Sequence, residues 1–162
     1  MKLALISLLL LIPSVVDTIA PDKTIHKEFS ELSQHEKREV ECLTKNVYRE
    51  ARGEPYGGLM AVAFVTMNRT ESEKFPSSVC EVVYQKNSRG CQFSWVCEKS
   101  RLIVNSEQYA SLRKFITKIY VNRSEMKDPT EGALFYHANY VNPYWSKMLV
   151  KTKTIGNHIF YK

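Results

Sequence analysis

Beyond its first twenty residues, the 162-residue sequence has no apolar run long enough to cross a membrane. A membrane-spanning helix needs about 17–25 predominantly apolar residues, and the most apolar later stretch, Leu59 to Met67, has only nine. That stretch therefore predicts a helix buried in a protein core. Internal repeats and low-complexity tracts are also absent, and the length suits one domain rather than two.

Dense runs of lysine or arginine are missing too, although the formal net charge is +6. Nucleic-acid-binding domains concentrate their basic residues in one patch or along one helix. The scattered charge therefore does not indicate a nucleic acid partner. It suits an anionic polymer such as a bacterial cell wall, and it suits a merely soluble surface equally well.

The N-terminus carries the one extended apolar run of the chain. Lys2 supplies a positive charge, residues 3–16 are apolar except for two serines and a proline, and Ala20 is a small residue at a cleavage position. This arrangement predicts a secretory signal peptide over residues 1–20, with an uncleaved membrane anchor as the alternative. We expect a polar lead-in over residues 21–32 and a folded domain over residues 33–162. The mature protein is expected to be secreted or periplasmic, without stable insertion in a membrane.

Cysteine is scarce, and every cysteine follows the predicted signal peptide, at Cys42, Cys80, Cys91 and Cys97. An even number in an exported chain favours one or two disulfides. The spacing does not reveal the pairing, although Cys91 and Cys97 are close enough in sequence to close one loop. A four-thiolate zinc site is the alternative, and the long gap after Cys42 fits it poorly.

The first long helix is predicted from its two ends. Ser33 and Glu36 have the spacing of a capping box, in which each side chain bonds the backbone amide of the other residue. Apolar residues then recur at three- and four-residue steps from Gln34 to about Arg52, as on one face of a helix. Gly53 follows as a natural helix stop.

Later elements are predicted more coarsely. Residues 86–90 are expected to form a loop, and residues 91–95 a short strand or an ordered loop. Helices are expected over residues 59–69, 79–85 and 106–121, a strand over 133–137, a helical turn near 142–145, and a closing strand over 154–161 with a bend at Gly156. The predicted fold class is therefore α+β, mostly helical, with a small sheet or hairpin from the C-terminal third.

Glu50 is unusual because it falls on an apolar helix face. It lies seven residues after Leu43 and three after Val47, so helical geometry puts it on or beside the buried stripe. A carboxylate there costs free energy unless it is paired, protonated or facing a cleft. The alternative, in which Glu50 has no catalytic role, is an ion pair, for example with Arg52.

Glu50 and Glu54 together are a candidate pair for glycoside hydrolysis. In that reaction one carboxyl group acts as an acid and the second as a nucleophile or base. A single carboxyl group with a raised pKa can also suffice, because it can protonate the leaving oxygen and then accept a proton from an attacking hydroxyl.

Polar residues alternate with aromatic ones in two later segments. Gln92 and Ser94 flank a phenylalanine, and Tyr136 and His137 follow another. Aromatic rings beside hydrogen-bonding groups suit the binding of sugar rings, whereas core packing is the simpler role for the phenylalanines. Tyr136 and Gln92 are the stronger candidates, since their polar ends need partners if they are buried.

Two alternatives use histidine. His137 and His158 with a carboxylate could bind zinc in an amidase or peptidase, but the helical two-histidine motif is absent. Either histidine could also pair with a cysteine nucleophile. Disulfide formation would remove the free thiol that such a nucleophile needs.

Short motifs occur in a fixed order from Cys42 to Tyr161. Examples are Glu-Ala-Arg-Gly-Glu-Pro at 50–55 and Cys-Gln-Phe-Ser-Trp at 91–95. The others lie at residues 42–43, 46–48, 61–63, 68–69, 75–76, 79–80, 82–85, 128–130, 132–133, 136–138, 155–158 and 160–161. In this order they resemble the SleB/CwlJ-type bacterial cell wall hydrolases, which include the spore cortex-lytic enzymes. The ordered set is far more specific than any single motif.

The resemblance implies a lysozyme-like fold and cleavage of the peptidoglycan glycan strand between N-acetylmuramic acid and N-acetylglucosamine. It implies that Glu50 is the catalytic acid and then the base of a lytic transglycosylase. A hydrolytic muramidase or glucosaminidase with the same residue is the alternative, and a zinc-dependent wall amidase is a more remote one. The expected substrate-binding residues are Glu54, Gln92, Ser94, Tyr136 and His137. Neither a metal nor a cofactor is expected, and the protein is expected to act on peptidoglycan as a monomer.

One departure from the family affects the expected biological role. Spore enzymes of this family often carry a separate wall-binding domain, and the 162 residues leave no room for one beside the catalytic domain. A spore role therefore does not follow from the resemblance, and we expect a secreted or periplasmic wall-remodelling enzyme, or a phage lysis enzyme of the endolysin type.

Overall fold

The computed structural model of the protein describes residues 25, 27–88, 90–98 and 105–162. The predicted signal peptide lies outside these residues, as do residues 21–24 and 26 of the predicted lead-in. Within the part of the chain that the structure describes, no helix has the length and apolar character needed to span a bilayer.

The helical part is assembled around α1 (Gln34–Ala51). The Ser33 hydroxyl accepts a hydrogen bond from the Glu36 amide, and the Glu36 carboxylate accepts one from the Ser33 amide, so the predicted capping box is confirmed. α1 packs against three other helices: α2 (Tyr56–Thr70), α3 (Val79–Tyr84) and α5 (Ser106–Val121). A short 3-10 helix, η1 (Phe29–Glu31), precedes α1 and contacts α5.

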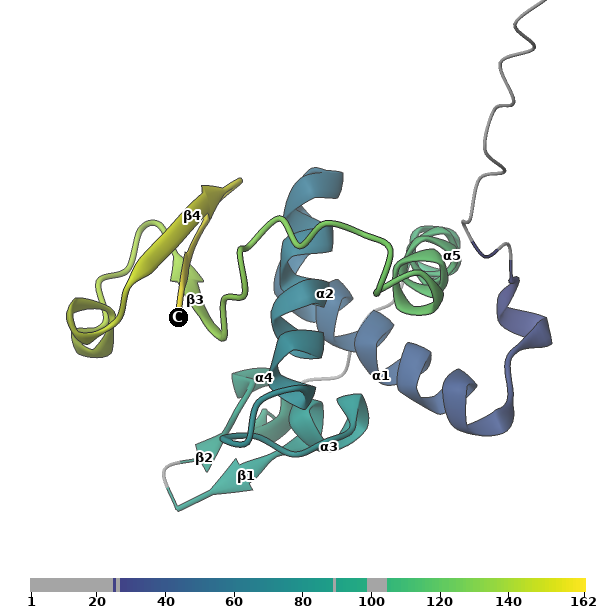
Figure 1. Ribbon diagram of the computed structural model, residues 1–162, viewed down its shortest axis with the longest axis horizontal. Helices are drawn as coiled ribbons and strands as arrows, with labels where there is room; N and C mark the ends of the chain where they lie inside the picture. The colour runs from purple at the N-terminus through teal and green to yellow at the C-terminus, as the bar shows by residue number, and fades with distance from the viewer. Residues whose placement is uncertain (1–24, 26, 89, 99–104) are drawn as a thin grey trace, which may run out of the picture.

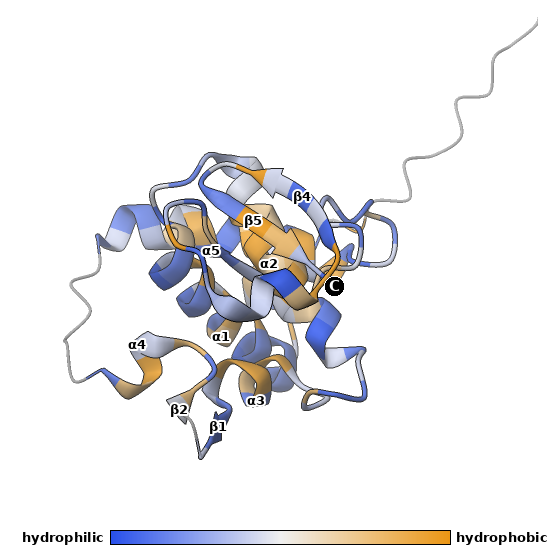
Figure 2. Cartoon of the chain, turned by 90° about the vertical axis from the view of Figure 1, so that its left-hand side faces the viewer, coloured by the Kyte–Doolittle hydropathy of each residue, from blue (hydrophilic) through white to orange (hydrophobic). Residues whose placement is uncertain are grey.

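α2 lies between the other helices and a C-terminal sheet, with α5 and the sheet on opposite sides of it (Figure 1). The sheet is antiparallel and consists, in spatial order, of β3 (Phe135–Ala138), β5 (His158–Tyr161) and β4 (Lys151–Ile155). Phe160 of β5 packs in a core cluster with Ala61 and Val65 of α2. Figure 2 shows α2 and β5 as strongly hydrophobic elements facing one another, which explains why α2 has no polar face.

Disulfides connect the smaller elements. Cys42 is bonded to Cys80, which joins α1 to α3, and Cys91 is bonded to Cys97. The second bond closes the loop between β2 (Gly90–Cys91) and the short helix α4 (Ser94–Cys97). The expectation of disulfides is thus confirmed, and none of the four cysteines is free.

Three local predictions were wrong. Helix α2 begins at Tyr56 rather than near residue 59, because Pro55 occupies the N-cap position and both following glycines are helical. In place of the expected loop, β1 (Lys86–Asn87) pairs antiparallel with β2, and the segment after β2 becomes helix α4 rather than a strand. The expected single closing strand is a hairpin of β4 and β5, because the left-handed backbone of Gly156 (φ 57°) reverses the chain.

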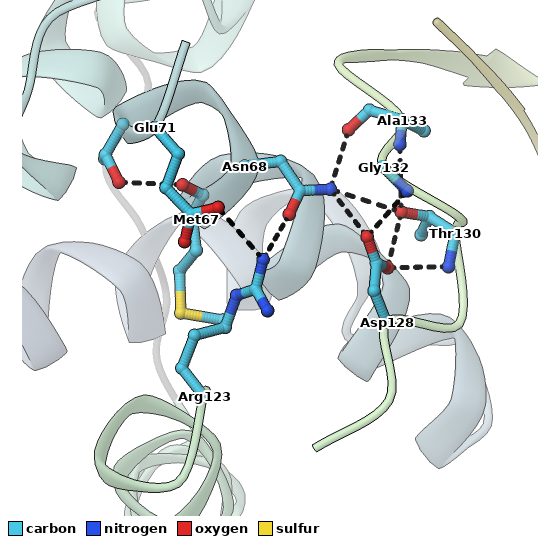
Figure 3. Close-up of polar contacts among 9 residues, drawn as sticks. Met67, Asn68, Glu71, Arg123, Asp128, Thr130, Gly132 and Ala133 are labelled. Atoms are coloured by element: carbon cyan, nitrogen blue, oxygen red, sulfur yellow. Dashed lines mark hydrogen bonds and ion pairs between the residues drawn. The ribbon is translucent and has the colours of Figure 1, made fainter. Parts of the chain in front are cut away.

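A buried polar network attaches the segment before β3 to α2 (Figure 3). The Asn68 amide nitrogen donates to Asp128 Oδ2 at 2.9 Å and to the Ala133 carbonyl at 3.0 Å. Arg123 donates to the Asn68 amide oxygen at 2.7 Å, and Asp128 also accepts hydrogen bonds from Thr130 and Gly132. This network fixes where β3 starts, and β3 carries Tyr136.

Candidate active site

The helices and the sheet meet at Glu50. It lies in the last turn of α1 beside the buried residues Val47 and Ala51, as the spacing predicted. Its side chain is partly buried, and Oε2 accepts a hydrogen bond of 3.1 Å from the hydroxyl of Tyr136 on β3. The structure therefore brings together two residues that are 86 positions apart in the sequence.

Glu50 lies where two cavities adjoin. The larger cavity, of about 530 Å³, is lined by Glu50, Arg69, Gln92, Phe93, Ser94, Phe135, Tyr136, Trp145, Met148 and Leu149. The smaller cavity, of about 270 Å³, is lined by Glu50, Ala51, Gly53, Glu54, Ala138, Tyr140, Asn157 and His158. Glu50 is the residue that these two linings share. We call the two together the Glu50 cleft.

Arg69 brings a buried positive charge to the larger cavity. The residue is 3% exposed, and its guanidinium lies 5.1 Å from the ring centre of Phe75 and 5.2 Å from that of Phe93. Its Nε donates to the Leu134 carbonyl at 2.8 Å. In the amide orientation that satisfies its neighbours, Gln92 accepts hydrogen bonds from both terminal nitrogens of Arg69 at 3.2 and 3.3 Å. Gln92 thus helps to hold the guanidinium in place.

The electrostatics of the cleft favour a protonated Glu50. Burial raises its pKa; the Tyr136 hydrogen bond and the Arg69 charge oppose this rise, and the Glu98 charge adds to it. Burial, together with the neighbouring Glu50, also raises the pKa of Tyr136 well above its usual range, so its hydroxyl stays a donor. Burial lowers the pKa of Arg69 to about 10, which leaves it charged at neutral pH. Burial therefore makes Glu50 a weaker acid than a free carboxyl group, and a hydrogen-bond donor and a cation lie nearby to stabilise the carboxylate that remains when a proton leaves.

The segment between β3 and β4 lines both cavities. Tyr140, which is 84% exposed, borders the smaller cavity. Trp145 and Met148, from η2 (Tyr144–Met148), border the larger one together with Leu149. The exposed ring of Tyr140 and the partly buried ring of Trp145 provide aromatic surfaces in the two cavities for flat ligands such as sugar rings.

Glu54 is held by the sheet. Its two carboxylate oxygens accept hydrogen bonds from the backbone amide and the side-chain amide of Asn157, at 3.0 and 2.9 Å. His158 Nδ1 lies 4.0 Å from the same carboxylate, and burial lowers the pKa of that histidine although Glu54 opposes the shift. Glu54 lines the smaller cavity as expected of a site residue, but its oxygens are engaged in attaching the β4–β5 turn to the end of α1.

The remaining predicted site residues differ in position. Ser94 is exposed at the start of α4, lines the larger cavity and donates to Glu98 at 3.1 Å. His137 lines neither side of the Glu50 cleft: its ring nitrogens lie 2.9 Å from the Ala138 carbonyl and from the Tyr161 hydroxyl. Its substrate-binding role stays a prediction that no contact in the cleft supports.

Sequence reasoning assigned no role to Arg69, Tyr140 or Met148. Arg69 had a usable signal, because it is a charged residue at the end of a helix that otherwise has no polar face. Tyr140 and Met148 had none, since they lie in a segment without regular periodicity whose position depends on the sheet. Among the residues with described positions, no three histidine, cysteine, aspartate or glutamate side chains form a group that could hold a metal ion.

A family model described as Cell Wall Hydrolase matches residues 53–161. This range includes Arg69, Gln92 and Tyr136 and begins just after Glu50. The spore cortex-lytic enzyme of Bacillus cereus is 28% identical over 129 residues, which cover 79% of this chain and 46% of that protein. The spore cortex-lytic enzyme of Bacillus subtilis is 29% identical over 123 residues, covering 75% and 37% respectively. The chain thus spans less than half the length of these curated relatives.

Solved structures give a consistent result. The catalytic domain of the Bacillus cereus SleB protein matches with a TM-score of 0.59 and 29% identity, covering 78% of this chain and 91% of that domain. The catalytic domain of the germination-specific lytic transglycosylase SleB from Bacillus anthracis matches with a TM-score of 0.57 and 31% identity, covering 81% and 97%. These matches confirm the predicted fold class, a mostly helical α+β domain of the lysozyme-like kind.

Proposed function

The chain belongs to the cell wall hydrolase family, and we propose on this premise that it cleaves the glycan strands of peptidoglycan. The bond cut is the one between N-acetylmuramic acid and N-acetylglucosamine, and Glu50 acts first as the acid and then as the base. The position of Glu50 carries this proposal: its carboxyl group, with a raised pKa, lies where two cavities adjoin. A strand running from one cavity into the other would place one glycosidic oxygen beside that group.

In the first step Glu50 gives its proton to the glycosidic oxygen, and the bond from that oxygen to the muramyl C1 breaks. Tyr136 donates its hydrogen bond to Oε2, which leaves Oε1 as the oxygen to carry the transferred proton. The carboxylate that forms keeps the Tyr136 hydrogen bond and the nearby Arg69 charge, both of which lower its pKa. Stabilising the anion in this way favours transfer of the proton.

In the second step the C6 hydroxyl of the muramyl residue attacks C1, and Glu50 accepts the hydroxyl proton. The product carries a 1,6-anhydro ring, no water is consumed, and Glu50 is protonated again. The state of Glu54 supports this route over one with a second carboxylate, because both of its oxygens are held by Asn157. Among the residues that the structure describes, Glu50 and Glu54 are the two carboxylates that line these cavities.

Mass spectrometry of the fragments released from purified sacculi tests the reaction. Transglycosylation predicts muramyl ends lighter by one water than reducing ends, with no isotope uptake in heavy-oxygen water. Reducing muramyl or glucosaminyl ends that carry the heavy oxygen would instead establish a hydrolase using the same Glu50. Newly freed amino groups with intact glycan strands would overturn glycan cleavage altogether.

A further inference from the structure

A third cavity, of about 370 Å³, lies on the α5 side of the corner between α1 and α2. Its lining includes Tyr48, Arg52, Tyr56, Leu59, Ser111 and Phe115. Glu50 does not line it, and the proton-transfer chemistry described above makes no use of it. We call it the corner cavity.

The walls of the corner cavity are mainly apolar, with one cation at the rim. Tyr56 is 73% exposed and makes an edge-on contact with Phe115, their ring centres 5.1 Å apart. The exposed Arg52 guanidinium lies 5.6 Å from the centre of the Tyr48 ring. Glu54 also lines the cavity, but its carboxylate is bonded to Asn157 in the β4–β5 turn. The cavity therefore combines aliphatic and aromatic surface with a positive charge.

This combination fits an acidic peptide better than a sugar ring. A buried sugar ring needs partners for several hydroxyl groups. The apolar surface of Leu59 and Phe115 supplies none, and the uncharged polar side chains of the lining are Gln108 and Ser111 together with the tyrosine hydroxyls. A peptide with small aliphatic side chains can bury its methyl groups on that floor and place a carboxylate beside Arg52. The peptide chains attached to muramyl residues of the bacterial wall have this chemistry.

The corner cavity and the Glu50 cleft share one lining residue. Glu54 lines both the corner cavity and the smaller cavity beside Glu50. Gly53 lies next to it, and a side-chain carbon added there would meet no atom within 4 Å. The chain between the two cavities therefore carries no side chain at Gly53, and Glu54 is the boundary at which they adjoin.

We propose that the corner cavity binds the peptide stem of the glycan strand that is cut at Glu50. The inference rests on the proposed function and adds a second recognition element to it. The enzyme then selects strands that carry peptides over bare glycan.

The test compares two substrates prepared from the same sacculi: intact sacculi, and glycan strands stripped of peptides by a wall amidase. Ser111→Trp fills the corner cavity from an exposed helix position, and Arg52→Gln removes the cation. Lys114→Trp, exposed on the same helix outside the cavity lining, is the matched control. Melting temperatures of all variants establish that the fold is retained.

The measured quantity is the cleavage rate on intact sacculi divided by the rate on stripped strands. We expect Ser111→Trp to lower this ratio about tenfold, the effect of losing one well-formed contact. Arg52→Gln should lower the ratio about threefold, and Lys114→Trp should leave it unchanged. An unchanged ratio in Arg52→Gln and in a folded Ser111→Trp variant would overturn the inference, as would equal slowing on both substrates. Wild-type protein that cleaves neither substrate would instead refute the proposed function.

Discussion

The two sides of the Glu50 cleft are held together by different interactions. On the helical side, Glu50 extends from a helix whose neighbours Val47 and Ala51 are buried, and a disulfide ties that helix to α3. On the sheet side, the apolar contact with α2 is small, centred on Phe160, and polar contacts supply much of the remaining attachment. Glu50 is therefore placed by a hydrophobic core, while its partner Tyr136 lies on a sheet whose attachment combines a small apolar contact with hydrogen bonds.

The difference separates the residues expected to take part in the reaction from the residues that hold the two sides of the cleft together. Asn68, Arg69 and Glu54 each extend from the helical side and bond the sheet side, at Ala133, Leu134 and Asn157. Removing a helical group in the cleft should affect the reaction with little loss of stability. Removing a connecting group should affect stability as well as the reaction.

Glu50→Gln should have the largest effect. The amide keeps the shape of the side chain but cannot give up a proton, so wall lysis should fall at least about 10³-fold. The melting temperature should stay within about 2 °C of wild type, because no core contact is lost. Turbidity loss of purified sacculi measures the activity, and Glu107→Gln, exposed on α5, is the control. A fully active Glu50→Gln protein would refute the catalytic role.

Glu54→Ala tests the attachment of the β4–β5 turn. It removes both hydrogen bonds to Asn157 and should lower the free energy of unfolding by about 2 kcal/mol. Glu131→Ala breaks only a half-exposed ion pair with Lys153 of β4 and should have a much smaller effect, because solvent screens such a pair. Urea unfolding measures both. Equal costs for the two variants would show that Glu54 is not a principal attachment of the sheet.

Asp128 tests the polar network before β3 through its pH dependence. Burial alone would raise the pKa of Asp128, but hydrogen bonds from Thr130, Asn68 and Gly132 outweigh it and hold the pKa below its ordinary value. A depressed folded-state pKa stabilises the protein above the unfolded-state pKa of about 4, and this contribution is lost as the pH falls through the folded-state pKa. Asp128→Asn should therefore cost about 1 kcal/mol at pH 7 and flatten the decline in stability below about pH 4. Urea unfolding midpoints of both proteins across this pH range check the prediction. A decline in stability of the Asp128→Asn variant as steep as that of wild type would contradict it.

Tyr136→Phe should have the smallest effect and the most specific one. The Tyr136 hydrogen bond lowers the pKa of Glu50, so its removal raises that pKa. Because the reaction begins with protonated Glu50, the alkaline limb of the pH–rate profile should move to higher pH by less than about one unit. The rate should fall only about threefold to tenfold. The control is Tyr161→Phe, which loses a contact with His137 outside the cleft and should leave the alkaline limb in place. A shift of this limb to lower pH in Tyr136→Phe would contradict the proposed geometry.

Local patterns in the sequence determined α1, the helix that carries Glu50, almost completely. The capping pair at Ser33 and Glu36 set the start of α1, and a three- and four-residue apolar period put Glu50 beside its buried face. These features could be predicted because a helix is specified by residues close together in the chain. The even number of cysteines likewise predicted disulfides, although not which sulfurs pair.

The tertiary structure alone decided the partners of Glu50. Tyr136 was a candidate from its side-chain chemistry, but its hydrogen bond to Glu50 depends on a sheet placed by the distant residues Asn68 and Asp128. Glu54 was expected in the substrate site, and its oxygens are instead held by the turn at Asn157. The reason is physical: hydrogen bonds and burial between residues far apart in the chain leave no periodic trace in the sequence, whereas helix faces and caps do.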